Sequence, residues 1–359
     1  MKMLVIMKRF GANKDMVTQN AGRQVKIFEA LSKFGYKIDF FCLDYKKHEN
    51  RNIKKRNINY LIRPYSIFKY YKLTDELKKI INKNKYDYIV GSTDPLLGIL
   101  GFKLAKKFNV RYIYDMQDEY SAYASYRIPF VRHWDKKAVK NSDIVLTVSD
   151  SLNSYIRKFR EKPTYTIQNG FDLKERRKIG KSRARKILNL PQGKIIIYIG
   201  EISRFKGVDI LIEAFKQVKR TIPNSYLLLT GKVADNINIR HDSIIYKEYP
   251  KREELIAALN AADIAVLPNK KSMFSRFSFP YKLADYMAAG LPIVATDIGD
   301  ASFAMSKYKN SICKLDDKFD MADKIIKKLG TNGRVDYGNV LNKLSWNSLA
   351  KKLDSIIKG

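Results

Sequence analysis

The chain has 359 residues, of which 45% are hydrophobic and 12% aromatic, a length that predicts two domains with a core each. Its formal net charge is +33, from 69 Lys and Arg against 36 Asp and Glu, and both halves share the excess. Such a charge favours anionic partners: membrane lipid, a lipid-linked pyrophosphate, a polyphosphate polymer or nucleic acid. The alternative is that part of this positive charge reflects a proteome rich in Lys, Ile and Asn.

Several site classes are excluded by residue usage. The two cysteines, Cys42 and Cys313, lie far apart, which fits a reducing cytoplasm rather than a disulfide framework. None of the three histidines is spaced as a metal pair, so we expect no metal centre. No apolar run approaches a membrane span, and Lys8 and Arg9 end the N-terminal apolar stretch too early for a signal peptide. We therefore expect a cytoplasmic protein, either soluble or peripheral on the inner face of the cell membrane.

The first half alternates apolar strands with amphipathic helices. This pattern predicts a doubly wound parallel sheet. The expected strands are 3–7, 38–43, 88–90, 111–114 and 144–148, and the helices are 23–33, 74–82, 96–108 and 130–140. A shorter element at 165–168 precedes a turn. In such folds ligands bind beyond the carboxyl ends of the strands, which here are followed by loops 10–22, 91–94 and 115–119. The loop residues that we single out there are Gly11, Asn20, Gly22, Asp94 and Gln117.

Residues 46–72 carry nine Lys or Arg, one acid and five aromatic residues. Basic and aromatic side chains together suit an anionic membrane surface, with the rings at headgroup depth. The alternative is a solvated loop and strand edge.

The alternation restarts after a polar, basic segment at 174–193, which we interpret as a linker with a helix that opens the second domain. Strands are expected at 194–199, 226–230, 244–246 and 264–267, and helices at 208–221 and 251–260. We assign 1–173 to an N-terminal domain and 194–340 to a C-terminal domain. Residues 341–359 include an amphipathic helix, predicted to pack back on the N-terminal domain.

The stretch 275–297 is the centre of the functional prediction. It is expected to form a loop, a helix at 281–289, a stop at Gly290 and a strand at 293–295. The N-terminus of this helix suits phosphate groups, and Arg276, Ser278 and Lys282 surround it. Asp285 lies one turn further on the same face, where a carboxylate can accept hydrogen bonds from sugar hydroxyls. The alternative is an ordinary surface helix.

Residues 195–300 resemble the C-terminal domain of glycosyltransferase family 4, the retaining nucleotide-sugar transferases. The resemblance is carried by YIGEISRFKGVDILIEAF, YLLLTG, ADIAVLPN and FPYKLADYMAAGLPIVATDIG, with fainter matches at GYKIDFF, SDIVLTVSDSL and IQNGFD. It implies an α/β chain of the GT-B fold, with two Rossmann-like doubly wound domains that face each other across a cleft.

The resemblance implies that the N-terminal domain binds the acceptor and the C-terminal domain binds the nucleotide-sugar. It also implies roles for residues. Lys206 matches the family lysine that neutralises the donor diphosphate, and Asp118 matches an acid at the sugar; these two are the predicted catalytic residues. Donor binding is assigned to Gly200, Arg204, Lys206, Arg276, Ser278, Lys282 and Asp285. No cofactor and no metal are expected.

Three positions depart from the family pattern. Glu201 stands where an arginine is usual, although Arg204 is a candidate to replace it. Phe277 stands at the first acid of the E-x7-E pair, whose second acid is Asp285. Gln117 stands where a histidine is usual.

The implied function is retaining transfer of a sugar from a nucleotide-diphosphate donor, expected to be a UDP-sugar, to a cell-surface glycan, a lipid-linked oligosaccharide or a glycopolymer. The departures motivate an alternative, a non-catalytic transferase-like subunit that binds an anionic polymer or a partner enzyme. Nucleic acid is not expected as a partner, because no nucleic-acid-binding signature accompanies the charge. The sequence predicts no oligomeric state.

Overall fold

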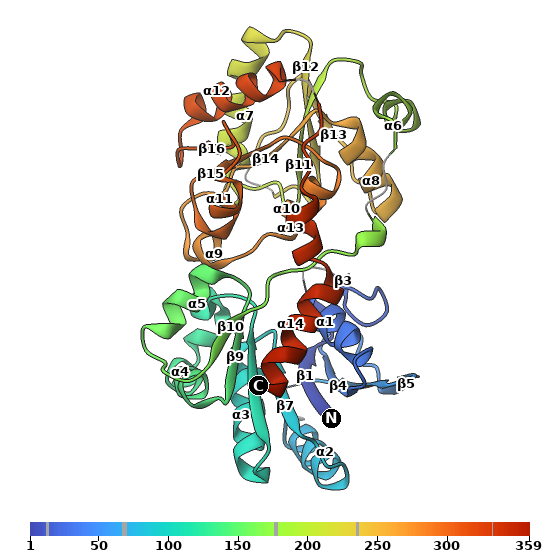
Figure 1. Ribbon diagram of the computed structural model, residues 1–359, viewed down its shortest axis with the longest axis vertical. Helices are drawn as coiled ribbons and strands as arrows, with labels where there is room; N and C mark the ends of the chain where they lie inside the picture. The colour runs from blue at the N-terminus through green and yellow to red at the C-terminus, as the bar shows by residue number, and fades with distance from the viewer. Residues whose placement is uncertain (12–13, 67–69, 176–178, 235–236, 332) are drawn as a thin grey trace. The chain divides into compact units, whose positions relative to one another are not determined.

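The computed structural model describes residues 1–11, 14–66, 70–175, 179–234, 237–331 and 333–359 (Figure 1). The chain divides into two compact units. Unit 1 comprises Met1–Gly170 and Trp346–Gly359, and unit 2 comprises Phe171–Ser345. The GT-B fold predicted from the sequence requires two such α/β units, each with its own parallel sheet.

Unit 1 is built on one large sheet, whose described strands run in the order β10-β9-β8-β7-β1-β4-β6-β5. Their bounds are β1 Lys2–Lys8, β4 Lys37–Asp44, β5 Arg51–Lys55, β6 Ile58–Pro64, β7 Tyr88–Ser92, β8 Arg111–Met116, β9 Ile144–Thr147 and β10 Thr164–Thr166. All neighbours are parallel except β5, which pairs antiparallel with β6. The centre of the sheet is β1, whose apolar run is buried on both faces, as a central parallel strand requires.

Helices cover this sheet. They are α1 Arg23–Ser32, α2 Tyr70–Lys83, α3 Pro95–Phe108, α4 Val131–Asn141, α5 Asp150–Arg157 and α14 Trp346–Lys358, with 3-10 turns at η2 Tyr120–Ala122 and η3 Ala124–Arg127. A small hairpin, β2 Phe10–Gly11 and β3 Lys14–Asp15, follows β1. The C-terminal α14 packs on α1 within unit 1, where Tyr36 Oη donates to Asp354 at 2.8 Å and Lys352 Nζ donates to the Thr166 carbonyl at 2.8 Å.

Residues 46–72 include the β5–β6 hairpin at the edge of the sheet, which agrees with the alternative of a solvated loop and strand edge. Tyr60 is fully buried and stacks on Phe40 with ring centroids 4.8 Å apart. Its ring therefore belongs to the core and cannot reach a membrane, whereas Tyr71 is 82% exposed. Phe68 lies outside the described residues.

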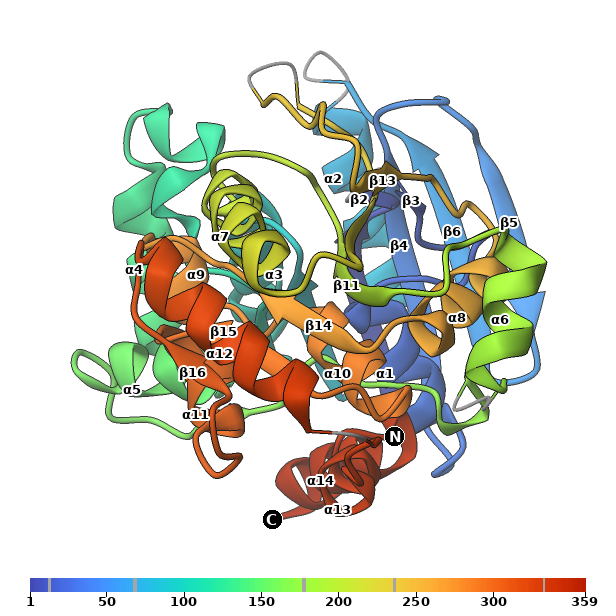
Figure 2. The same ribbon diagram turned by 90° about the horizontal axis from the view of Figure 1, so that it is seen from above.

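Unit 2 has a parallel sheet with the strand order β13-β12-β11-β14-β15-β16 among its described residues. The strands are β11 Lys194–Ile199, β12 Ser225–Thr230, β13 Ile244–Tyr246, β14 Ile264–Leu267, β15 Ile293–Thr296 and β16 Ile312–Cys313. The helices are α6 Lys181–Leu188, α7 Val208–Thr221, α8 Arg252–Ala261, α9 Met273–Phe277, α10 Tyr281–Ala288, α11 Gly299–Met305, α12 Lys318–Gly330 and α13 Gly338–Lys343, and η4 is Leu173–Glu175. Figure 2 shows α6 beside α8 and α7 near α12, and each pair packs together.

One helix of unit 2 was predicted and another was not. The segment 174–193, predicted to be a linker with a helix that opens the second domain, includes α6, which packs within unit 2: Arg185 is buried and bonds the Ala261 carbonyl at 3.0 Å and Asp263 at 2.7 Å. The loop predicted before α10 contains the one-turn helix α9, which forms because Ser272 caps it by accepting from the Ser275 N–H at 3.0 Å. Among the described helices of both units, none is long and apolar enough to cross a bilayer.

A buried ion pair lies at the carboxyl end of the unit 1 sheet. Arg23, at the start of α1, is fully buried; it bonds Asp115 of β8 through Nη1 and the Ile167 carbonyl through Nε at 3.0 Å. The other oxygen of Asp115 accepts from Ser92 Oγ at 2.7 Å. The pair therefore links α1, β7 and β8 and the segment after β10.

Removing Asp115 should destabilise the protein, because the charge of Arg23 then stays buried without a partner. Asp115→Ala leaves the Arg23 charge buried without its carboxylate, and we expect it to lower the free energy of unfolding by about 3–5 kcal/mol, measured by urea denaturation. The control is Asp75→Ala, which removes the exposed partner of Lys78 and should change little. Equal effects of the two substitutions would contradict the prediction.

Candidate active site

The loop after β11 brings two lysines together in unit 2. Gly200 has a φ of 127°, which favours glycine, and a Cβ built on it would lie 2.9 Å from Lys282 Nζ. Glycine at this position therefore lets the ammonium of Lys282, from α10, approach the backbone. Lys206 follows in the same loop, before Gly207, which has a φ of 75° and precedes α7.

Lys282 is held in a low-dielectric environment. Its Nζ donates to Tyr198 Oη at 3.0 Å and lies 4.1 Å from the centroid of the Tyr198 ring. Burial first, and the charge of the nearby Lys206 second, lower the pKa of Lys282 to about 7, while Glu201 offsets part of the effect. Two ammonium groups thus lie near each other at an electrostatic cost that a bound anion would remove.

Aromatic rings surround Lys206. Its Nζ lies 3.7 Å from the centroid of the Phe274 ring and 5.0 Å from that of the Phe205 ring. These cation–π contacts orient the side chain. The sequence analysis did not single out either ring, because Phe274 belongs to α9, far from Lys206 in sequence.

The other predicted donor-binding residues lie around the start of α10. Ser278 ends α9, and among the described residues no side chain caps the N-terminus of α10 at Pro280. The N–H groups of its first turn are therefore suited to an anion. Arg204 and Arg276 are exposed, and no described contact joins either of them to the two lysines.

Phe277, at the position of the first family acid, is 4% exposed and forms part of the core. Its aromatic side chain replaces a carboxylate with buried apolar surface, so this position supplies no charged contact to a sugar.

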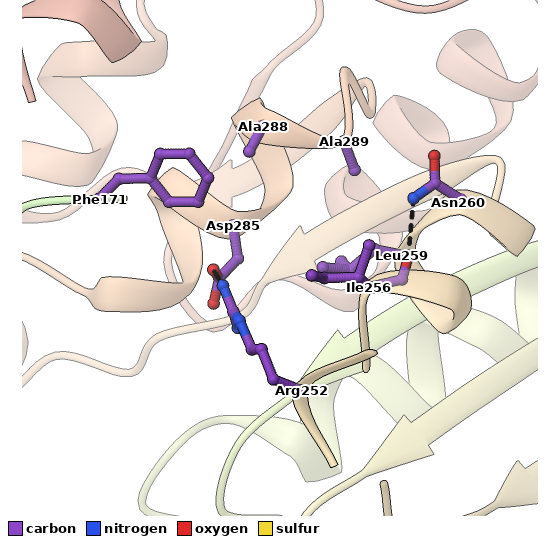
Figure 3. A pocket seen from close by; sticks show the side chains of 8 residues that line it. All are labelled: Phe171, Arg252, Ile256, Leu259, Asn260, Asp285, Ala288 and Ala289. Carbon is purple, nitrogen blue, oxygen red and sulfur yellow. Dashed lines mark hydrogen bonds and ion pairs between the residues drawn. The ribbon is translucent and has the colours of Figure 1, made fainter. Parts of the chain in front are cut away.

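Asp285 is part of a second feature, a small hollow beside α10. Figure 3 shows Asp285 and Arg252 pointing toward each other, and Arg252 Nη2 bonds Asp285 Oδ1. The hollow has a volume of about 10 Å³, room for about one water molecule, and is also lined by Phe171, Ile256, Leu259, Asn260, Ala288 and Ala289. Among the described residues, Asp285 Oδ2 has no hydrogen-bond donor.

The sequence analysis missed Arg252. A signal was present, because a basic residue in the first turn of a helix opposes the helix dipole and needs another reason to be there. The ion pair with Asp285 supplies that reason.

In unit 1, Gln117 is the centre of a polar network. Its Nε2 donates to Gln24 Oε1 at 3.0 Å and to Ser92 Oγ at 2.9 Å. The neighbouring Asp118 accepts a hydrogen bond from Tyr123 Oη at 2.7 Å. Both residues are half-buried at the carboxyl end of β8.

Asp94 has a structural environment. It is 2% exposed, caps α3 by accepting from the Leu96 N–H at 2.9 Å, and pairs with Lys8 at 2.5 Å. These contacts account for the aspartate by structural roles alone. From the sequence, a helix-capping aspartate could not be told from one that contacts a ligand.

The remaining predicted loop residues precede α1. Gly11 lies in β2, Asn20 has a φ of 45°, and Gly22, with a φ of 83°, is the residue before the helix. Three buried polar atoms here have no hydrogen-bond partner among the described residues: Asn20 Oδ1, Arg23 Nη2 and Gln24 Nε2. Because buried polar groups are usually paired, these atoms are candidate contacts for a bound molecule.

The donor-binding candidates thus belong to unit 2, and Asp118 with the acceptor-loop candidates belongs to unit 1. In the part of the chain that the structure describes, no group of three or more His, Cys, Asp or Glu is arranged to hold a metal ion.

Known proteins resemble both the sequence and the fold. A putative teichuronic acid biosynthesis glycosyltransferase of Bacillus subtilis is 26% identical over 268 residues, which are 67% of this chain and 65% of that protein. The chain therefore spans slightly less than two thirds of that relative. Sucrose-phosphate synthase from Thermosynechococcus elongatus has a similar structure, with a TM-score of 0.76, 20% identity and coverage of 100% and 98% of the two chains. Alr3699/HepE from Anabaena, solved in complex with UDP and glucose, has a TM-score of 0.72 and 13% sequence identity, and the match covers 99% of both chains.

Two family models match the two halves of the chain. The one described as Glycosyltransferase Family 4 matches residues 25–175, and the one described as Glycosyl transferases group 1 matches residues 193–330. With most of the chain matched and both sheets built as the fold requires, the chain belongs to the GT-B glycosyltransferases that these models describe.

Proposed function

We propose that this chain is a retaining glycosyltransferase that transfers a sugar from a UDP-sugar to a cell-surface glycan, a lipid-linked oligosaccharide or a glycopolymer. The observation that carries the proposal is the proximity of two cations: Lys282, whose Nζ lies beside Gly200, and Lys206, whose charge lowers the pKa of Lys282. The choice of donor is supported by the UDP bound in the Anabaena structure, and the choice of acceptor by the Bacillus relative, whose name gives it a putative role in teichuronic acid biosynthesis.

The two lysines and the first turn of α10 would bind the diphosphate. Negative charge grows on the leaving nucleoside diphosphate as the glycosidic bond breaks, and cations already held in place stabilise that charge without reorganisation. In this proposal Lys282 supplies the second cation, which the family usually takes from an arginine at the position of Glu201. No metal ion is invoked in this step.

Retention would follow from departure and attack on the same face of the sugar. The bond from the anomeric carbon to the phosphate oxygen breaks, the acceptor oxygen bonds to that carbon, and the acceptor proton passes to the departing phosphate oxygen. Asp118 would orient the sugar or the acceptor. Asp285 would bind the ribose through Oδ2, while Arg252 holds Oδ1.

A thermal-shift panel of nucleoside diphosphates and their sugars tests the donor. A ligand at one hundred times its dissociation constant adds about 2.7 kcal/mol of stability, so UDP should shift the unfolding temperature more than ADP or GDP. Donor hydrolysis then tests catalysis. UDP binding without hydrolysis or transfer would favour the non-catalytic subunit, for which the departures at Glu201, Phe277 and Gln117 argue.

Lys206→Ala should lower turnover by about 100-fold, the scale for losing one preorganised charge in a water-poor site. Lys216→Ala is the matched control, because Lys216 is an exposed lysine on α7 that pairs only with the exposed Glu213 among the described contacts. If the Lys206 variant turns over within a few-fold of the control, Lys206 does not take part in the mechanism.

Asp285→Asn should weaken UDP binding by roughly 1–3 kcal/mol, measured by calorimetry, because it replaces a charge-assisted hydrogen bond to the ribose with a neutral one. Asp285→Glu keeps the charge and should retain most of the affinity. If wild type and the Asn variant bind UDP equally, the Asp285 carboxylate serves only its ion pair with Arg252.

UDP affinity should fall as the pH rises above about 7. Lys282 titrates near pH 7 in the free protein, and a bound diphosphate favours its charged form, so binding above that pH takes up a proton. The expected loss approaches tenfold in affinity per pH unit, up to about pH 9. Lys282→Arg, which stays charged, should bind with a flatter pH dependence. Identical pH profiles of the two proteins would contradict the role of Lys282.

A further inference from the structure

Unit 1 exposes three large apolar side chains within a short stretch at the start of α4. Ile128 is 49% exposed, Phe130 is 76% exposed and Trp134 is 36% exposed. Side chains of this size are normally buried, and single exceptions are common, but three within seven residues form a patch.

The backbone at Phe130 adds to this observation. Its φ is 65°, a conformation uncommon for a bulky residue and costly unless something compensates for it. Phe130 is the N-cap residue of α4, so this conformation occurs where the chain enters the helix, and it leaves the ring at the surface.

The exposed charges around the patch are mostly basic; the exposed acid Asp143 lies beside Lys106 and Lys137. On α4, Arg132, Lys136, Lys137 and Lys140 are exposed, whereas the acid of this helix, Asp135, is 2% exposed and accepts hydrogen bonds from Tyr114 and Tyr126. The core thus removes negative charge from this face.

The neighbouring α3, which packs on α4 (Figure 1), adds Lys103, Lys106 and Lys107. The ammonium groups of Lys103 and Lys137 lie 4.5 and 4.9 Å from the Trp134 ring centroid. We call this surface the α3–α4 patch, defined by Lys103, Lys106, Lys107, Ile128, Phe130, Arg132, Trp134, Lys136, Lys137 and Lys140.

We propose that the α3–α4 patch binds the surface of an anionic lipid bilayer, with Ile128, Phe130 and Trp134 at the boundary between headgroups and acyl chains. The lysines and arginine would contact lipid phosphates, each contributing to an attraction that falls with salt. Nucleic acid would match the charges and stack on the aromatic rings, but it has no use for the aliphatic Ile128. A bilayer matches all three apolar side chains and the charge.

The patch is connected to the candidate site within unit 1. Residues 118–130 run from Asp118 to Phe130 through η2 and η3, and Tyr123 and Tyr126 of this segment bond Asp118 and Asp135. A lipid-linked acceptor anchored at the patch would enter beside Asp118. Only this step rests on the proposed function; binding to the bilayer does not.

The test measures binding of the full chain to vesicles of phosphatidylcholine alone and of phosphatidylcholine with about one third phosphatidylglycerol. Wild type should sediment with the anionic vesicles only, and Trp134 emission should shift to shorter wavelength. Trp134→Phe should abolish the shift although Trp346 remains. Phe130→Ser should weaken binding, while Phe303→Ser, at a ring that is 81% exposed in unit 2, should not.

Matched charge variants localise the contact. Replacing Lys136, Lys137 and Lys140 together with Gln should weaken binding on the order of 100-fold at low salt, about fivefold per charge. The same replacement of Lys54, Lys55 and Arg56 on the β5–β6 hairpin removes equal charge without exposed rings and should weaken binding far less. Thermal unfolding and donor hydrolysis should be unchanged in these variants, so a failed patch is distinguishable from a failed transferase.

Three results would overturn the proposal. The first is that wild type does not bind anionic vesicles at low salt. The second is that the two triple variants lose equal affinity, which would make the attraction a property of the net charge. The third is that Phe130→Ser weakens binding to a DNA duplex as much as to vesicles, which would make the patch a nucleic-acid surface.

Discussion

The candidate site residues of both units depend on one constraint, the parallel alignment of the main strands. Parallel strands need crossover helices, so all carboxyl ends of a sheet lie at the same edge, with loops and helix N-termini. In unit 2 this edge carries Gly200, Lys206 and the start of α10; in unit 1 it carries Gln117 and Asp118. The antiparallel β5 departs from the rule only at the outer edge of the sheet, away from these loops.

The strands of these sheets could be predicted because buried parallel strands are continuous apolar runs; β1, β4, β8, β11 and β14 all appear where the sequence predicts them. The β5–β6 hairpin could not, because half of its side chains face solvent and the pattern is that of a loop. The loops of the candidate site could be located from the alternation of elements. The proposed role of Lys206 came from the family resemblance, and that of Asp285 from its place on the helix face. The pairing of Asp285 with Arg252, and the contact of Lys206 with Phe274, join residues remote in sequence, and periodicity carries no information about such contacts.

The departure at Glu201 illustrates why position in space matters more than position in a motif. A cation near the diphosphate can come from any element that ends at the same edge, and Lys282 reaches Gly200 from α10. Its burial beside Lys206 is unfavourable in the free protein, which is the expected sign of a site shaped for a bound anion rather than for stability.

The net charge of +33 has a different status, since a charge spread over the whole chain attracts any polyanion and identifies none. The sequence predicted a membrane contact at residues 46–72 from basic and aromatic content alone. Folding separates the two kinds of residue there, because Tyr60 enters the core while Lys54, Lys55 and Arg56 stay at the edge. On α4 folding does the opposite: it buries the carboxylate of Asp135 and leaves Phe130, Trp134 and the lysines outside. Which charges a membrane can use is therefore decided by what the core removes from the surface.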